Sequence, residues 1–526
     1  MNDKPKSKWY WRVLRWGLIG LAVLATLVAV LVTEENWRGK RDWEAYKQAA
    51  EARGERLDVD SVIPPTVPDD LNFFCAPIVA EALEADRDDM MEASERHVTN
   101  AVNRMNFDLW RGGIAGQIKQ GGSWQKAELT DLKQWQKAFR NFSATPEGKT
   151  NGFPVPVQSQ TPAADVLLAL RVFDPTLEEL RRASERPYAR IPLDYENDFE
   201  AASELLPWLA TIKRSAQFLE LRIQAEEQSN QGAQALADTK LLLRVTDSAR
   251  EQPFLISHLV RMAMMAYVVQ PIYEGLAQHC WSDAQLMELE QALAKEDYLA
   301  DYQFTMRGEK LFAIDTLERQ RVTREIKSVE YQNGSSRVMT TSLQWEPSAY
   351  FYQNELSFAL MHQRFIVRLV DSTNRIMSPT ALQRAENESK SERKHYSPYQ
   401  AQAQMLLPAI VKSVEKFAFV QASIDLARVA CALERYRLAN GKYPSTLDAL
   451  APQFIEHVAH DIINGQPLHY RIREDGPPSQ SSGPASNFVL YSVGWNEKDD
   501  GGTVVLTKSG LVDREKGDWV WQYPTK

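Results

Sequence analysis

The chemistry that the sequence could support is concentrated near its carboxyl end, where carboxylates and one carboxamide surround the glycine pair 501–502. These side chains are Asn496, Glu497, Asp499, Asp500 and Asp518. Hard oxygen donors on a flexible loop are the ligands that calcium prefers. The sequence therefore offers a calcium site whose metal would hold the loop closed rather than take part in catalysis. A solvated acidic turn has the same composition, so both interpretations stay open here.

Other chemical motifs are weak. His457 and His460 are three residues apart and next to Asp461, a spacing that puts both rings on one face of a helix. A catalytic zinc would also need a third ligand and a carboxylate base, so we expect ordinary histidines. The sequence has no GxSxG, GxGxxG or HExxH pattern, and no SxxK with a KTG-like partner. We predict no catalytic and no cofactor-binding residues, with calcium as the one cofactor suggested.

An uncharged apolar run at residues 17–33 follows a basic flank at residues 1–16. With Trp16, it reaches the length that a helix needs to span a bilayer. Aromatic residues stand at both ends, as interfaces favour. The basic flank predicts that the N-terminus lies in the cytoplasm and that the bulk of the chain lies outside it. A cleaved signal peptide has the same order of regions, but no small-x-small cleavage site follows the run, so we predict a retained transmembrane helix.

Composition and charge narrow the class of protein further. The 526 residues are 44% apolar and 25% charged, which is ordinary for a globular protein with a sizeable core. The formal net charge is −9, and the basic flank makes the remainder more acidic still. Nucleic-acid binding needs clustered Lys and Arg, so we predict no nucleic-acid partner. Three widely spaced cysteines do not form a disulfide framework.

The middle of the chain is predicted to be mostly helical. Residues 34–160 form a membrane-proximal mixed region, in which 86–149 show little helical pattern. Apolar residues recur at three- and four-residue spacing through a helical domain at 161–400, most strongly over 200–324. Within that domain, 329–347 are predicted to be polar and flexible, and 378–399 to be a solvated charged loop.

The last region, 401–526, combines a long helix with short strands and resembles a known module. The runs ALERYRLANGKYPSTLDAL (432–450), NGQPLHYRI (464–472) and YSVGWNEKDDGG (491–502) resemble the soluble domain of the major pseudopilin of type II secretion. That family has a long helix ending in a Tyr and Gly-x-Tyr-Pro turn, followed by a small antiparallel sheet. It binds calcium in its last loop, which implies calcium at residues 496–518 here, with the family's terminal acidic segment matched only by Asp518.

The resemblance covers about a fifth of the chain and has clear departures. In pseudopilins the membrane helix continues into the long helix and begins with a peptidase motif, whereas here the apolar run lies far upstream and has no such motif. We therefore do not expect processing or polymerisation as a pilin. The whole layout is also similar to uncharacterised bacterial envelope proteins, through the WEAY run at 43–46, the prolines at 64, 65 and 68, the PFLISHLV run at 253–260 and the C-terminal module.

These patterns predict an α+β protein with an N-terminal transmembrane helix, a helical middle and a small pseudopilin-like module. The expected function is a non-catalytic interaction or scaffold component of the bacterial envelope. It would sit in the inner membrane with its bulk in the periplasm and would contact other envelope proteins, with a link to type II secretion or pilus-like machinery. The alternative is an envelope hydrolase whose site is assembled from scattered residues, which a cleft with paired carboxylates would favour.

Overall fold

The computed structural model describes residues 7–90, 103–109, 114, 118, 121–193, 195, 198–332, 335–393, 397–473 and 487–524. Part of the predicted basic flank, including Lys4 and Lys6, lies outside the described residues. Within them the chain is mostly helical and carries small antiparallel sheets, as the α+β prediction requires.

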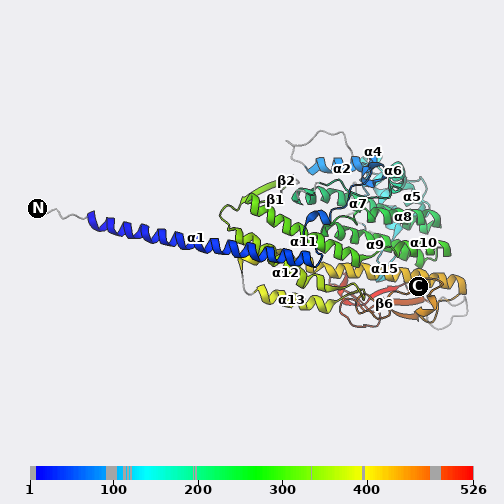
Figure 1. Ribbon diagram of the computed structural model, residues 1–526. Coiled ribbons are helices and arrows are strands. Elements are labelled where there is room, and N and C mark those ends of the chain that lie inside the picture. Colours follow the sequence, from blue (N-terminus) through cyan, green and yellow to red (C-terminus); the bar gives the residue numbers. More distant parts are fainter. Residues whose placement is uncertain are drawn as a thin grey trace.

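Helix α1 (Ser7–Ala52) is a single helix of 46 residues that projects from the body of the molecule (Figure 1). Its apolar stretch has no buried residues, and by length and composition it could cross a membrane. A second helix, α9 (Leu255–Ala277), is also long and apolar enough to cross a membrane, but 61% of its most apolar stretch is buried inside the molecule. Because α9 is surrounded by protein, α1 is the candidate membrane anchor and α9 is a core helix.

The second half of α1 is packed onto the body rather than tethered to it. Trp43, Tyr46 and Ala50 form a small apolar core with Ile314 and Ala359. Burying an aromatic side chain of this size stabilises a contact by about 1.5–3 kcal/mol. Gly39 lies against α12 (Ser348–Phe365), where an added Cβ would be in ordinary contact with the Tyr352 Cβ atom at 3.4 Å.

The other helices follow in chain order: α2 (Pro77–Met90), α3 (Leu132–Ser143), α4 (Pro146–Asn151), α5 (Pro162–Leu170), α6 (Asp174–Ser184), α7 (Asp198–Gln228), α8 (Gly232–Asp247), α9, α10 (Asp283–Leu293), α11 (Tyr298–Thr323), α12 (Ser348–Phe365), α13 (Pro379–Arg393), α14 (Ala401–Val411) and α15 (Ser413–Asn440). Local signals set several ends. Ser282 and Gln285 form a capping box at the start of α10, and α15 stops at Gly441, whose φ of +73° suits glycine.

The strands are β1 (Glu325–Gln332), β2 (Ser335–Ser342), β3 (Val370–Asp371), β4 (Ile376–Met377), β5 (His469–Arg473), β6 (Asn487–Ser492), β7 (Val504–Leu506), β8 (Val512–Gly517) and β9 (Trp519–Gln522). The largest sheet has the order β5-β6-β9, all antiparallel, and β7 pairs separately with β8. In its register His469 pairs with Tyr491, and Tyr491 pairs with Val520.

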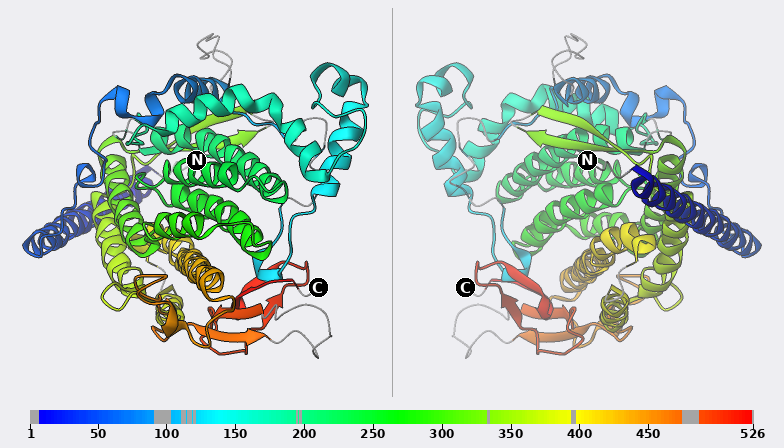
Figure 2. Two further views of the ribbon diagram at one scale, coloured as in Figure 1. Left: turned by 90° about the vertical axis from the view of Figure 1, so that its right-hand side faces the viewer. Right: turned by 90° about the vertical axis from the view of Figure 1, so that its left-hand side faces the viewer.

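Helix α15 lies between this sheet and the middle helices, as both views in Figure 2 show. It packs on β6 and β9 on one side and on α9, α10 and α11 on the other. One continuous hydrophobic core therefore extends from Val62 to Tyr523. The C-terminal module is built into the helical body, and residue 400 does not separate two cores.

Three predictions about local structure are wrong. Residues 329–347, expected to be flexible, lie largely in the β1–β2 hairpin. Residues 378–399, expected to be a loop, contain α13, whose Leu382 and Ala385 are buried at helical spacing. Residues 86–149, expected to show little helical pattern, contain α3, which buries Leu132, Trp135, Phe139 and Phe142 along one face and begins at the N-cap Asp131.

Candidate functional sites

The predicted calcium loop is organised around the buried carboxylate of Asp518. This carboxylate accepts hydrogen bonds from the backbone N–H groups of Asp500 (3.2 Å), Gly502 (2.6 Å) and Thr503 (3.2 Å). Burial raises the pKa of Asp518, and the three backbone hydrogen bonds oppose that rise. Asp518 therefore closes the loop through amide groups, which is the structural role that the sequence interpretation gave to a metal.

The remaining predicted ligands form hydrogen bonds with groups of the protein. Asp499 accepts hydrogen bonds from the Gly501 N–H at 2.9 Å and the Tyr491 hydroxyl at 3.0 Å. Asn496 donates to the Asp500 carboxylate at 2.7 Å, and Glu497 accepts a hydrogen bond from Thr380 of α13. Across the described ranges, no three His, Cys, Asp or Glu side chains are grouped as a metal ion would need. Calcium binding at this loop stays a prediction.

A set of buried acidic and amide side chains between α7 and α9 was missed at the sequence level. We call it the acid layer, and its members are Glu220, Gln224, Glu227, Gln270 and Glu274. The three glutamates are 6%, 1% and 0% exposed, in that order. On α7, Glu220, Gln224 and Glu227 lie three, four and seven residues apart, and on α9 Gln270 and Glu274 lie four apart. The members on each helix therefore share one face.

The segment 121–130 covers one side of the acid layer. The Glu274 Oε1 atom accepts hydrogen bonds from the backbone N–H of Thr130 at 3.0 Å and from its hydroxyl at 2.6 Å. It also accepts from Gln224 at 3.2 Å and from Gln270 at 2.9 Å. The side-chain carbonyl oxygen of Gln270 in turn accepts a hydrogen bond from the Trp124 backbone N–H at 2.7 Å. Glu274 is thus the centre of a hydrogen-bonded group.

Glu227 differs from Glu274 because neither of its carboxylate oxygens has a hydrogen-bond partner among the described residues. Burial raises the pKa of Glu227 well above its ordinary value, and repulsion from Glu274 and Glu226 raises it further. Burial and Glu274 act in the same way on Glu220. The raised pKa favours the protonated form of both glutamates in the folded protein. Because both are buried, they could donate a proton only to a substrate that displaces the residues covering them.

Next to the acid layer, Glu434 joins the helical body to the C-terminal module. Its carboxylate bonds the His279 Nδ1 atom at 2.8 Å and accepts from the Tyr443 hydroxyl at 2.9 Å and the Arg437 guanidinium at 2.6 Å. Burial would raise the pKa of Glu434, but the hydrogen bonds and charges of Arg437 and His279 outweigh it and hold the pKa at about 2. Glu434, Arg437 and Tyr443 all lie in the run 432–450, so this run contains a structural ion pair.

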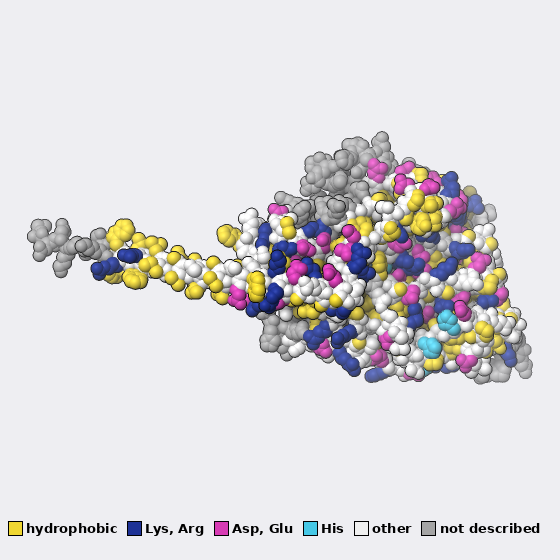
Figure 3. Space-filling view, in the orientation of Figure 1, with side chains coloured by type: hydrophobic (Ala, Val, Ile, Leu, Met, Phe, Trp, Pro, Cys, Tyr) yellow, Lys and Arg dark blue, Asp and Glu magenta, His cyan; other side chains and the backbone are white. Residues whose placement is uncertain are grey.

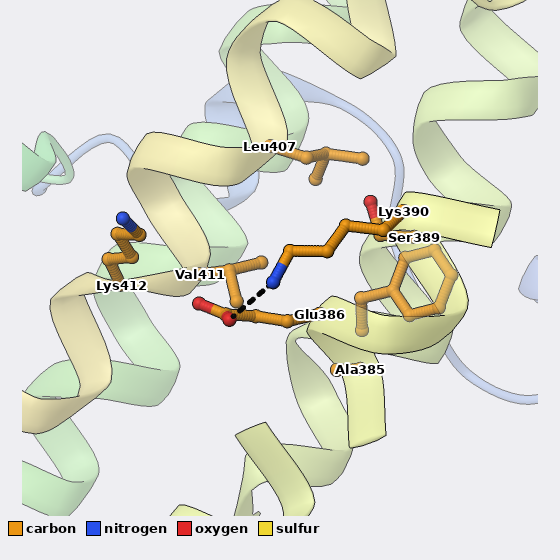
Figure 4. Close-up of a pocket in the computed structure, with 8 residues that line it drawn as sticks. Ala385, Glu386, Ser389, Lys390, Leu407, Val411 and Lys412 are labelled. Carbon is orange, nitrogen blue, oxygen red and sulfur yellow. Dashed lines mark hydrogen bonds and ion pairs between the residues drawn. The ribbon is translucent and has the colours of Figure 1, made fainter. Parts of the chain in front are cut away.

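An apolar cavity of 230 Å³ lies between α12, α13 and α14 (Figure 4). Phe365, Leu407 and Val411 line it, and Glu386 and Lys390 reach toward each other along α13 with a 3.4 Å ion pair. Ligand pockets usually have volumes of about 300–1,000 Å³. This cavity is smaller, and two of its three charged residues, Glu386 and Lys390, pair with each other, so it offers little to fix a ligand.

Comparisons of the chain with protein-family models, with curated proteins and with solved structures found no match.

Proposed function

We propose that the chain is a membrane-anchored extracytoplasmic protein, a non-catalytic scaffold or interaction component of the bacterial cell envelope. In this proposal α1 spans the inner membrane with its N-terminus in the cytoplasm, and the body lies in the periplasm. The C-terminal module would contact other envelope proteins, such as components of type II secretion or pilus-like machinery.

The observation that carries the proposal is the continuity of α1 from its apolar stretch into the packed body. Asn36, three residues after the apolar run ends at Thr33, already accepts a hydrogen bond from the Ala349 N–H at 2.6 Å. A helix without a flexible linker holds the body at one height and one orientation. That arrangement suits a protein that presents surfaces to neighbours more than an enzyme that must reach scattered substrates.

Further support comes from how the C-terminal module is held. The Tyr273 hydroxyl of α9 donates to the Gln522 carbonyl of β9 at 2.9 Å. Trp124 packs against Trp521 with ring centroids 5.4 Å apart. These contacts fix the module to the anchored body, so any partner that binds the module is placed relative to the membrane.

An envelope hydrolase is the second proposal, and the acid layer is the observation that favours it. Paired carboxylates with a raised pKa are what general acid catalysis uses. Their burial is the difficulty, because a substrate would have to displace segment 121–130 before it met Glu220 or Glu274.

The test is to purify the tagged full-length protein from gently solubilised membranes and to identify by mass spectrometry what accompanies it. We expect stoichiometric envelope partners. A variant with Leu506→Glu and Leu511→Glu, two exposed apolar residues of the module, should lose them. Val157→Glu, at a still more exposed site outside the module, is the control and should keep them. Recovery of the wild-type protein alone would contradict the scaffold proposal and turn attention to hydrolase substrates.

The topology is tested separately with a reporter fused after Lys526. A reporter that is active only in the periplasm should work, because the basic flank before the apolar run favours a cytoplasmic N-terminus. Activity of a reporter that functions only in the cytoplasm would overturn the proposed orientation.

A further inference from the structure

The contacts of α1 establish which end of the body faces the anchor. Moving along α1 away from the apolar stretch, its partners on α12 change from Ala349, beside Asn36, to Ala359, beside the core of Trp43 and Tyr46. Helix α12 therefore runs parallel to α1. Its first residues, and the β1–β2 hairpin before them, stand at the end from which α1 emerges (Figure 1).

This end of the body lies close to where the apolar stretch ends. From Thr33 to Asn36 the helix rises about 4.5 Å. Each headgroup layer of a bilayer is about 5–7 Å thick. If α1 spans a membrane, the Asn36–Ala349 contact is therefore at headgroup depth, and the residues just before Ala349 lie beside the same layer.

Residues 343–348 form a turn that is held by hydrogen bonds and in which the Trp345 side chain is exposed. The Trp345 side chain is 97% exposed. Arg324 holds the turn by donating to the Glu346 carbonyl and to the Ser348 hydroxyl, both at 2.7 Å. The Leu343 N–H donates back to the Arg324 carbonyl at 2.7 Å. A large apolar side chain on a turn that is fixed by three hydrogen bonds is presented to something outside the chain.

The other exposed tryptophans of the described residues indicate which environment Trp345 meets. They are Trp9, Trp11, Trp16 and Trp37, all on α1 and all flanking its apolar stretch. Trp345 is the one exposed tryptophan of the described body, and it occurs at the end where α1 leaves. Val322, on the last turn of α11, adds a 72% exposed apolar side chain just before Arg324. Tryptophan favours the membrane interface because its ring is apolar and its N–H is polar.

We propose that the body rests on the outer leaflet of its own membrane through this rim, with Trp345 and Val322 in the headgroup layer. The occupant of the rim is lipid, and the inference rests on the proposed anchoring of α1. Charged side chains of both signs surround the base of α1 at this end (Figure 3), as expected for a surface facing zwitterionic and anionic headgroups. Two contacts, the helix and the rim, would fix the tilt of the body.

The test uses the full-length chain in lipid nanodiscs, with the native cysteines replaced (Cys75→Ser, Cys280→Ser, Cys431→Ala) and one spin label attached. Labels are placed at Trp345→Cys, at Val157→Cys as the exposed control on the body, and at Val23→Cys in the apolar stretch. Accessibility to oxygen and to a water-soluble nickel chelate is then compared. We expect the label at position 345 to collide with nickel severalfold less than the label at 157, while remaining accessible to oxygen.

The three positions separate the outcomes. A label at 345 that is as accessible to nickel as the one at 157 overturns the inference, provided that position 23 is in lipid. A label at 23 that is accessible to nickel overturns the anchor itself. Protection of 345 from both reagents means that protein covers it, which also overturns a lipid contact.

A second measurement needs no cysteine replacement. In nanodiscs made with brominated lipid, Trp345→Phe should remove a quenchable part of the tryptophan emission. An unchanged quenched fraction would contradict the proposal even if the cysteine-free background folded poorly.

Discussion

Two clusters of buried ionisable side chains share helix α9, and their carboxylates are neutralised by different means. One is centred on Arg261, which is 0% exposed and bonds Asp301, Glu296 and, at 2.9 Å, Asp247; we call it the arginine cluster. The other is the acid layer around Glu274, in which no cation of the described residues bonds a glutamate. A buried carboxylate must be neutralised by a counter-charge or by a proton. The arginine cluster uses mainly the first means, and in the acid layer the raised pKa of Glu220 and of Glu227 favours the second.

The difference should appear as a difference in what each cluster tolerates. Burial lowers the pKa of Arg261, but Tyr298 and the three surrounding carboxylates outweigh it and keep the guanidinium charged. Removal of that charge leaves Asp301 without a bonded cation among the described residues, while Glu296 and Asp247 keep Arg250 as a partner. We expect the acid layer to tolerate the change of one glutamate to an amide better, because a raised pKa favours the neutral form of its glutamates.

The largest expected effect is that of Arg261→Met. Removing one partner from a buried ionic group typically costs about 3–5 kcal/mol, because the remaining charges stay buried. We expect a loss of that size in the free energy of unfolding, measured by urea titration of the full-length protein in detergent. Lys240→Met is the control, since Lys240 pairs with Glu288 on the surface, with side chains 56% and 46% exposed; surface pairs contribute about 0–1 kcal/mol. Equal losses in the two variants would contradict the comparison.

The second prediction concerns pH and Glu227. Its folded-state pKa is raised, so the folded protein keeps a proton that the unfolded chain releases. The resulting stability is complete below the ordinary glutamate pKa of 4.5 and is lost as the pH rises toward the raised value. Glu227→Gln, which carries no titrating proton, should unfold with a flatter dependence on pH between about pH 5 and pH 8.

At the alkaline end of that range the Glu227→Gln variant should be more stable than the wild type, and near the acid end the two should be alike. The measurement is the urea midpoint across the pH series. Glu288→Gln, at an exposed site, is the control and should leave the slope unchanged. A wild-type slope in the Glu227→Gln variant would show that this carboxyl is ionised when folded and that the acid layer resembles the arginine cluster after all.

The contrast between the clusters also explains how far the sequence could be interpreted. Signals that depend on neighbouring residues were reliable: the apolar run at 17–33 lies in one exposed helix, the helical pattern over 200–324 became α7 to α11, and the short strands expected in 401–526 include β5, β6 and β9. Each is set by a few adjacent side chains. Strand β8 was missed because its run VDREKG is polar and is held by pairing with β7.

The acid layer was invisible for a different reason. Glu220, Gln224 and Glu227 occur among apolar residues at helical spacing, which a pattern search takes for the polar face of an amphipathic helix. They are buried only because α9 and segment 121–130 close over them, and no local rule places residues a hundred positions apart side by side. A polar stripe on α7 matched by Gln270 and Glu274 at four-residue spacing on α9 was the available signal. The hydrogen bond from Thr380 of α13 to Glu497 could not be foreseen for the same reason, because it also joins residues far apart in the chain.

The smallest expected effect tests how protonation of Glu274 and its hydrogen bond from Thr130 each contribute to the stability of the acid layer. Thr130→Val removes the hydroxyl that donates to Glu274 at 2.6 Å and keeps the shape of the side chain. Burial raises the pKa of Glu274 and this hydrogen bond lowers it, so the variant should raise that pKa further. We expect a loss of about 1 kcal/mol in the free energy of unfolding near neutral pH.

The loss should be smaller in acid, where Glu274 is protonated in both the folded and the unfolded state. Thr239→Val is the matched control, because the buried Thr239 hydroxyl donates to the Ala235 backbone carbonyl of its own helix and not to a carboxylate. That variant should show a loss that does not change with pH. If the two variants respond to pH alike, the Thr130 hydroxyl contributes only as a polar contact, and the proton on Glu274 is held by burial alone.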